Sequence, residues 1–289
     1  MMIIKKIKEN PVKFILILFI LIILLNKSFN NVSYYTGNKI GLIEINMPIM
    51  KSDKIIKDLN YFKNNEDVKA IVVRVDTPGG AVAASQEIYL KIKQISNFSK
   101  PVYVSMGNVA ASGGYYLSLG ADTIIANSGT ATGSIGVIMG YPIINEFMEN
   151  IGIEYKTIKS ALYKDAGSAF RSQTNSDSSY LQILVDDLHD QFINAIVLER
   201  GIDRKKVEKL ANGKVYSGIQ ALENNLIDMI GTLEDAYNIA NNRLDASKEP
   251  IILLPPKEKE GIFDMILNNI NTSTTFNYSY PIPLFRMLY

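Results

Sequence analysis

The chain has 289 residues, a net charge of +1 and an ordinary globular composition, which predicts one or two domains. The near-neutral charge provides no basic field, so we expect no nucleic acid partner. The chain contains no cysteine and one histidine, His189. Disulfides, thiol nucleophiles and cysteine-ligated zinc are therefore excluded, as are sites that need two histidines. In a hydrolase, the base would have to be a carboxylate, a lysine or that imidazole.

Residues 13–29 are predicted to form a transmembrane signal anchor. They contain an uninterrupted apolar run, Phe14–Leu25, and no small-x-small cleavage motif follows it. The lysines that precede this run predict that residues 1–12 stay in the cytoplasm. The rest of the chain would then lie outside, held at the cell membrane by a single pass. A cleaved signal peptide is the alternative.

A polar linker is predicted at residues 30–38, and after it strand-like and helix-like segments alternate. The predicted strands are Lys39–Ile45, Ala70–Val75, Pro101–Ser105, Thr123–Ala126, Gly136–Met139 and Ile153–Ile158. The predicted helices are Lys51–Phe62, Ala83–Ile95, Ser176–Arg200, Lys205–Leu210 and Ile219–Leu226. This alternation predicts an α/β domain over residues 39–245, with mostly parallel sheets and flanking helices. Residues 246–289 are predicted to be a C-terminal tail.

Two glycine-containing segments adjoin predicted strands. Thr77–Gly80 follows a buried strand, where paired glycines let backbone N–H groups approach a ligand closely. A tight turn is the alternative, and no lysine follows to make a phosphate-binding loop. Thr130–Val137 places Ser134 between two glycines, and by itself this segment predicts a turn.

A third segment of small residues, Ser105–Tyr116, runs from a strand into a predicted helix. Ser112 would lie at or near the start of that helix. It is either an N-cap, which is a common use of serine, or a nucleophile with N–H groups nearby for an oxyanion. The surrounding residues do not form the G-x-S-x-G motif, which disfavours an α/β-hydrolase.

A nucleophilic serine needs a base. His189 lies among Asp186, Asp187 and Asp190 on the longest helix, which predicts a solvated polar face. A lysine can act instead if desolvation lowers its pKa from about 10.4 to about 7–8. Composition and spacing leave three lysines as candidates: Lys156, Lys159 and Lys164.

Together, these segments resemble the signal peptide peptidase A family, the membrane-anchored serine–lysine proteases of the ClpP/crotonase superfold. The resemblance covers about Ile40 to Ala240. The matching segments, in the family's order and spacing, are Val73–Gly80, Lys100–Tyr116, Thr130–Gly140, Ile153–Ser168 and Asn212–Asp228. The resemblance implies a ClpP/crotonase-like fold.

The resemblance also implies a role for each matching site residue. The family's nucleophile falls on Ser112, and its general base falls on Lys164. The serine that orients the lysine amine falls on Ser134, and the oxyanion donors would be the backbone amides of Gly80 and Gly113. Neither a metal nor an organic cofactor is implied.

Two departures from the family pattern affect this site. The family's lysine–serine–glycine turn reads Lys159, Ser160, Ala161 in this chain, a change that could alter the local turn. The family often has three glycines after Thr-Pro, whereas this chain has two and then Ala81. The amide that points toward the oxyanion is therefore left open by the sequence.

The implied activity is that of a serine endopeptidase that degrades remnant signal peptides and other short apolar peptides at the membrane. Longer relatives carry the serine and the lysine in separate tandem units. This chain has one unit holding both, so the resemblance implies a homo-oligomeric ring. In that ring Ser112 of one subunit would meet Lys164 of a neighbour.

Three alternatives are weighed against this function. A crotonase-type enzyme acting on acyl-CoA is disfavoured by the predicted export, since CoA is cytoplasmic. A non-catalytic membrane-anchored scaffold or regulator is disfavoured by the joint presence of the serine and lysine residues. A related membrane serine protease directed at a specific membrane protein is not distinguished by the sequence. The tail could pack on the domain, contact the membrane or occupy the active-site groove.

Overall fold

The computed structural model describes residues 19, 37–244, 248–256 and 284–287. The chain divides into two units, Met1–Gly37 and Asn38–Tyr289, and only the second is described at length. The predicted anchor at 13–29 lies almost wholly outside the described residues. Within the described part of the chain, no helix combines the length and apolarity needed to span a bilayer.

The main sheet of the second unit is predominantly parallel, as the alternating pattern predicts. Its order is β10 (Ile251–Leu253), β1 (Lys39–Ile45), β2 (Val68–Thr77), β4 (Val102–Ala111), β5 (Thr123–Ala126), β9 (Met229–Ile230). Each neighbouring pair in this order is parallel. β6 (Ala131–Gly133) runs parallel to the end of β4 and pairs antiparallel with β8 (Val215–Ser217). The α/β architecture is thereby confirmed.

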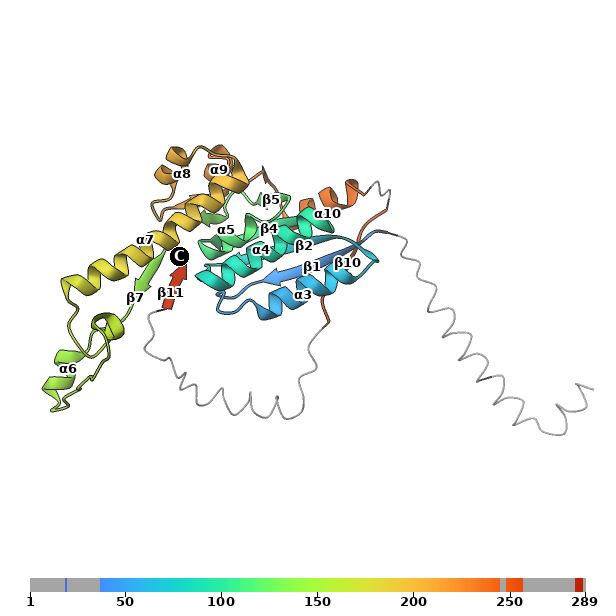
Figure 1. Cartoon of the computed structure of the whole chain (residues 1–289). Coiled ribbons are helices and arrows are strands. Elements are labelled where there is room, and N and C mark those ends of the chain that lie inside the picture. Colours follow the sequence, from blue (N-terminus) through green and yellow to red (C-terminus); the bar gives the residue numbers. More distant parts are fainter. Residues whose placement is uncertain (1–18, 20–36, 245–247, 257–283, 288–289) are drawn as a thin grey trace, which may run out of the picture. The chain divides into compact units, whose positions relative to one another are not determined.

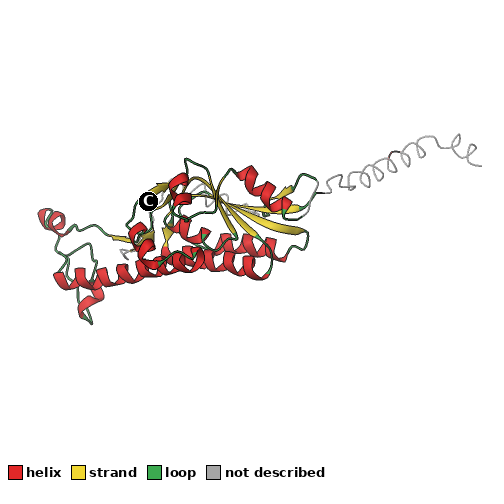
Figure 2. Cartoon of the chain, turned by 90° about the horizontal axis from the view of Figure 1, so that it is seen from above, coloured by secondary structure: helices red, strands yellow, loops and turns green. Residues whose placement is uncertain are grey.

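Helices cover both faces of this sheet, as Figures 1 and 2 show. One core cluster packs α3 (Asp53–Asn64), α4 (Val82–Phe98), α5 (Gly113–Ser118) and part of α7 (Asn175–Arg200) on one face. The other face is covered by α10 (Leu233–Asn242), which the sequence pattern did not predict. Two short helices, α8 (Arg204–Leu210) and α9 (Gly218–Glu223), follow α7. Parallel strands need apolar cover on both faces, and these layers supply it.

A second, three-stranded sheet contains the segment predicted as Gly136–Met139. That segment forms β7 (Ile138–Gly140), which pairs with β11 (Leu284–Met287) rather than with the main sheet. On its other side β11 pairs with β3 (Gly80–Ala81), and both pairings are antiparallel. Part of the predicted C-terminal tail is therefore a strand between β3 and β7.

Residues 141–174, here called the arm, connect β7 to α7. The arm contains α6 (Asn145–Asn150) and the 3-10 turn η1 (Leu162–Asp165). In both views α6 lies away from the main sheet, on the side of the sheet where α7 begins (Figures 1 and 2). The strand predicted at Ile153–Ile158 is absent, so that prediction is wrong. Its residues are exposed and pair with no neighbouring strand, and a strand requires a partner backbone.

Candidate active site

Ser112 occupies the turn between β4 and α5, where its backbone is strained. Its φ of 53° and ψ of −113° lie in a region that residues with a side chain rarely adopt. The residue is fully buried, its hydroxyl makes no capping hydrogen bond, and its Oγ has no partner among the described residues. Ser112 therefore stands at the N-cap position of α5, but its side chain does not cap the helix. A buried, unpaired hydroxyl held in a strained turn is typical of a nucleophile.

The segment Thr130–Val137 is hydrogen-bonded to the backbone of Ser112. The Ser112 amide donates to the carbonyl of Gly133 at 2.7 Å, and the next residue, Ser134, donates its amide to Lys214 at 2.8 Å. Gly133 and Ser134 both have positive φ, 75° and 48°. Ser134 is buried. The fold thus brings the segment that carries Ser134 to the turn that carries Ser112.

Gly80 and Gly113 also meet beside the serine. A Cβ placed on Gly113 would lie 3.1 Å from the Gly80 nitrogen and 2.5 Å from Ser85 Oγ. A Cβ placed on Gly80 would lie 2.0 Å from the carbonyl oxygen of Ile49. Only glycine fits at either position. The amide of Gly113 also opens α5, where a helix N–H has no intrahelical acceptor.

Hydrogen bonds on either side of Gly80 bear on which amide is free to face an oxyanion. The amide of Gly79 donates to Thr77 Oγ1 at 3.2 Å, and the amide of Ala81 donates to the Ile49 carbonyl at 2.7 Å. Both flanking amides are therefore engaged by the protein. The amide of Gly80 is the remaining one in this turn, and Gly80 is paired with Met287 of β11.

The three candidate lysines differ in their partners. Lys156 pairs with Glu154 at 3.3 Å, and Lys159 pairs with Asp165 at 2.6 Å. Lys164, in η1, is exposed and forms no ion pair with any described residue. Among the three candidates, Lys164 is thus the one whose ammonium is not engaged by a carboxylate of the described residues.

The chain alone does not bring Lys164 to the serine. Ser112 Oγ lies between β4 and α5 and accepts no hydrogen bond from Lys164 or from any other described residue. Lys164 belongs to the arm, which follows β7 in the sequence, whereas Ser112 precedes β7. The structure therefore gathers Ser112, Ser134, Gly80 and Gly113, and leaves Lys164 apart.

The single histidine lies in an environment that the sequence did not predict. His189 is half-buried on the side of α7 that carries Phe192 and Ile196, one and two turns further along. Its Nε2 is buried and has no partner in the described part of the chain. The predicted solvated face is therefore wrong for this ring. It also makes no hydrogen bond with Ser112 Oγ.

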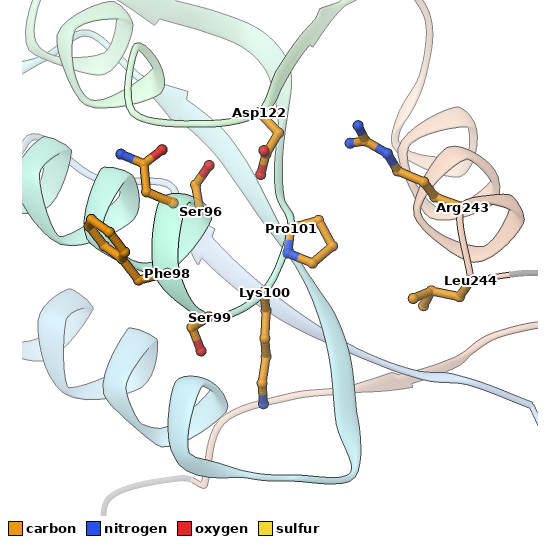
Figure 3. Close-up of a pocket in the computed structure, with 9 residues that line it drawn as sticks. Ser96, Phe98, Ser99, Lys100, Pro101, Asp122, Arg243 and Leu244 are labelled. Atoms are coloured by element: carbon orange, nitrogen blue, oxygen red, sulfur yellow. The ribbon is translucent and has the colours of Figure 1, made fainter.

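A hollow of about 720 Å³ lies at the opposite end of β4 (Figure 3). Its lining includes Lys100 and Pro101, directly before β4, whereas Ser112 directly follows that strand. The Lys100 ammonium donates to the carbonyl of Phe62 at 2.7 Å and also to that of Asn65. The hollow is thus separate from the serine, and its lysine is already engaged by backbone oxygens.

Comparison with known proteins identifies the family. The model of peptidase family S49 matches residues 94–247, more than half of the chain, and that of the Clp protease family matches residues 32–131. The chain belongs to peptidase family S49. Both matches include Ser112, and the S49 match also includes Ser134 and Lys164. The family assignment agrees with a strained serine beside two glycine amides.

Several individual proteins are similar to this S49 family member. A putative protease of Synechocystis is 43% identical over 203 residues, 70% of this chain and 73% of that protein. A putative signal peptide peptidase SppA of Enterococcus faecium is 36% identical, over 63% of this chain and 53% of that protein. A solved ClpP1 mutant of Listeria monocytogenes has a TM-score of 0.45 and 14% identity, over 68% of this chain and 93% of that one.

Proposed function

We propose that this S49 peptidase is a membrane-anchored serine endopeptidase that uses Ser112 and Lys164 to degrade remnant signal peptides and other short apolar peptides. The observation that carries the proposal is the buried, unpaired Ser112 hydroxyl in a strained turn beside the amides of Gly80 and Gly113. The anchor is supported by the apolar sequence of residues 13–29.

The proposed reaction follows from these positions. Ser112 Oγ attacks the peptide carbonyl while the neutral amine of Lys164 takes its proton. The amides of Gly80 and Gly113 bind the oxyanion. Lys164 returns the proton to the leaving amine, which departs and leaves an acyl-enzyme. Lys164 then takes a proton from a water molecule, whose oxygen attacks the acyl carbon. The bond between that carbon and Ser112 Oγ breaks, Lys164 gives the proton to Oγ, and the second peptide leaves as a carboxylic acid.

Two subunits are proposed to complete each site. Lys164 lies apart from Ser112 within the chain, on an arm that exposes many large apolar side chains. These are Ile143, Phe147, Ile151, Ile153, Tyr155, Ile158, Leu162 and Tyr163. Such a surface is typical of one covered by a partner. A second copy of this chain is the proposed partner, because the serine site lacks a base without it.

The substrate class is supported by the second sheet. β11 is an extended segment paired antiparallel with both β3 and β7. β3 contains Gly80, so a peptide strand in the place of β11 runs past the proposed oxyanion donor. Extended pairing of this kind suits unstructured peptides and excludes folded proteins. An open groove of about 950 Å³ lies beside the 47–51 segment, which is hydrogen-bonded to the turn that contains Gly80. It is lined in part by Met47, Pro48, Met50 and Leu254.

The test is hydrolysis of a fluorogenic apolar peptide by the full-length protein in detergent, beside Ser112→Ala and Lys164→Ala. Lys156→Ala, another exposed lysine of the arm, is the matched control. We expect both site variants to be inactive and the control to keep wild-type activity. Wild-type activity in Lys164→Ala would refute the assigned base. A wild-type protein that cuts no peptide would favour the scaffold alternative.

Co-expression of the two inactive variants tests the shared site. In a ring with shared sites, some interfaces join an intact Ser112 to an intact Lys164, so activity should return in mixed rings. Mixed rings without activity would show that both residues must belong to the same chain.

A further inference from the structure

The turn that carries Lys164 is held by a charge network. Asp165 directly follows Lys164 in η1, and its carboxylate accepts two hydrogen bonds from Arg171, from Nε at 2.9 Å and from Nη2 at 2.9 Å. The same carboxylate accepts a bond from Lys159 Nζ at 2.6 Å. A bidentate arginine–carboxylate pair fixes orientation as well as distance. The backbone next to Lys164 is therefore tied on two sides.

Arg171 also reaches the start of α7. Its Nη1 donates to Asp177 Oδ2 at 2.6 Å, and Asp177 is buried in the capping box that it forms with Thr174. Further along α7, Phe192 packs 4.9 Å from the ring of Tyr116, measured between centroids. Tyr116 lies in α5, the helix that Ser112 precedes. A continuous path therefore links the Lys164 turn to the core beside the serine.

The network also balances the charge beside Lys164. An uncompensated Asp165 would favour the ammonium form of its neighbour, which opposes action as a base. The charged groups of this network come from every segment around the turn: Lys159 before it, Asp165 within it, Arg171 after it and Asp177 on α7. These are two cations and two anions, so their charges cancel.

We infer that Arg171 is a positioning residue for Lys164, which anchors the lysine turn to α7 and neutralises Asp165 beside the lysine. The inference rests on the proposed function, in which Lys164 is the base. It assigns to Arg171 a role in the geometry and the protonation of Lys164, with no contact to the peptide. The free chain holds this network by itself, so the lysine turn is preorganised before any partner meets it.

The test compares Arg171→Gln, Arg171→Lys and Asp165→Asn in the full-length protein with the fluorogenic peptide, measuring kcat, KM and the pH profile of kcat/KM. Arg204→Gln is the matched control, because Arg204 also bridges two carboxylates, those of Asp190 and Glu208, and lies outside the arm. Thermal unfolding is measured for each variant.

We expect Arg171→Gln to lower kcat about tenfold or more with KM nearly unchanged, because the base is misplaced while the peptide site is intact. The lower midpoint of its pH profile should rise by about half a unit, since Asp165 is less compensated. Arg171→Lys should restore the midpoint but only part of kcat, because lysine keeps the charge and loses the bidentate geometry. Asp165→Asn should lower kcat without raising the midpoint.

Wild-type kcat and an unshifted midpoint in Arg171→Gln, as in Arg204→Gln, would overturn the inference. A loss spread equally over kcat and KM with no change of midpoint would overturn it as well. If Arg171→Gln unfolds, Arg171→Lys and Asp165→Asn decide by kcat, and wild-type kcat in both would overturn the inference. Failure of the proposed function looks different, because wild-type activity would then survive Ser112→Ala or Lys164→Ala.

Discussion

The hydroxyl of Thr77 accepts a hydrogen bond from the backbone amide of Gly79, 3.2 Å away. The same hydroxyl donates to the carbonyl of Met47 at 2.8 Å, and Thr77 is fully buried. One side chain therefore joins the end of β2 to both the glycine turn and the 47–51 segment. This arrangement determines where the amide of Gly80 lies relative to Ser112.

Replacing Thr77 with valine should displace the Gly80 amide. The shape is kept, but the Gly79 amide and the Met47 carbonyl lose their partner, at a cost of about 1–3 kcal/mol in stability. We expect kcat to fall about tenfold or more while Thr77→Ser, which keeps the hydroxyl, stays close to wild type. Peptide hydrolysis and chemical denaturation measure the two effects. Equal kcat values for the valine and serine variants would contradict this role.

Gly80→Ala should disrupt the turn far more than a glycine substitution in open surroundings. The new Cβ would lie 2.0 Å from the Ile49 carbonyl oxygen, which is backbone and cannot move aside as a side chain can. Gly136→Ala is the control, because its Cβ would meet its nearest atom, Gly213 Cα, at an ordinary 3.5 Å. We expect loss of activity and a lower Tm only in Gly80→Ala. Full activity and an unchanged Tm in that variant would contradict the predicted clash with Ile49 and show that the turn accommodates a Cβ at position 80.

Removing residues 284–289 should make the peptide site more accessible. β11 occupies the position between β3 and β7 where we propose that a substrate strand binds. Since an added peptide must compete with this strand, its removal should lower KM with kcat little changed. Steady-state kinetics on an apolar peptide measure this, beside a control that lacks only residues 288–289. An unchanged KM in the shorter protein would show that β11 does not compete.

The structure of the arm should change at acid pH, because Asp165 becomes protonated there. The guanidinium of Arg171 and the ammonium of Lys159 lower the pKa of Asp165 from 3.8 to about 2. Because the folded pKa is depressed, the stabilisation is fully present above pH 3.8 and is lost as the pH falls through about 2. The chain has no tryptophan, so near-ultraviolet circular dichroism reports tyrosines, including the stacked Tyr163 and Tyr180.

The control for this titration is Asp165→Asn, which lacks the titrating group. We expect the wild-type tyrosine signal to change between pH 4 and 2, and the same change to be smaller in the variant. Identical titrations would show that Asp165 does not stabilise the arm.

Local patterns predicted most of the regular structure. The strands β1 and β5 have the predicted bounds, and α7 begins one residue from its predicted start and ends where predicted. These elements have strong periodicity or dense β-branched residues, and their faces are buried against the sheet or core. The alternation predicted Ile153–Ile158 as a further strand, but the arm offers no partner strand to that segment.

The sequence by itself determined the family resemblance, the α/β class and the positions of Ser112, Ser134 and the glycines, because these depend on short motifs next to buried strands. Tertiary structure decided the rest. It rejected the capping role of Ser112, separated Lys164 from the other two candidate lysines, and brought β11 beside β3. The pairing of β11 with β3 joins residues far apart in the chain, and local periodicity carries no information about such pairings. The ion pairs of Lys156 and Lys159 join near neighbours in the sequence, but they depend on side-chain geometry, which periodicity does not predict either.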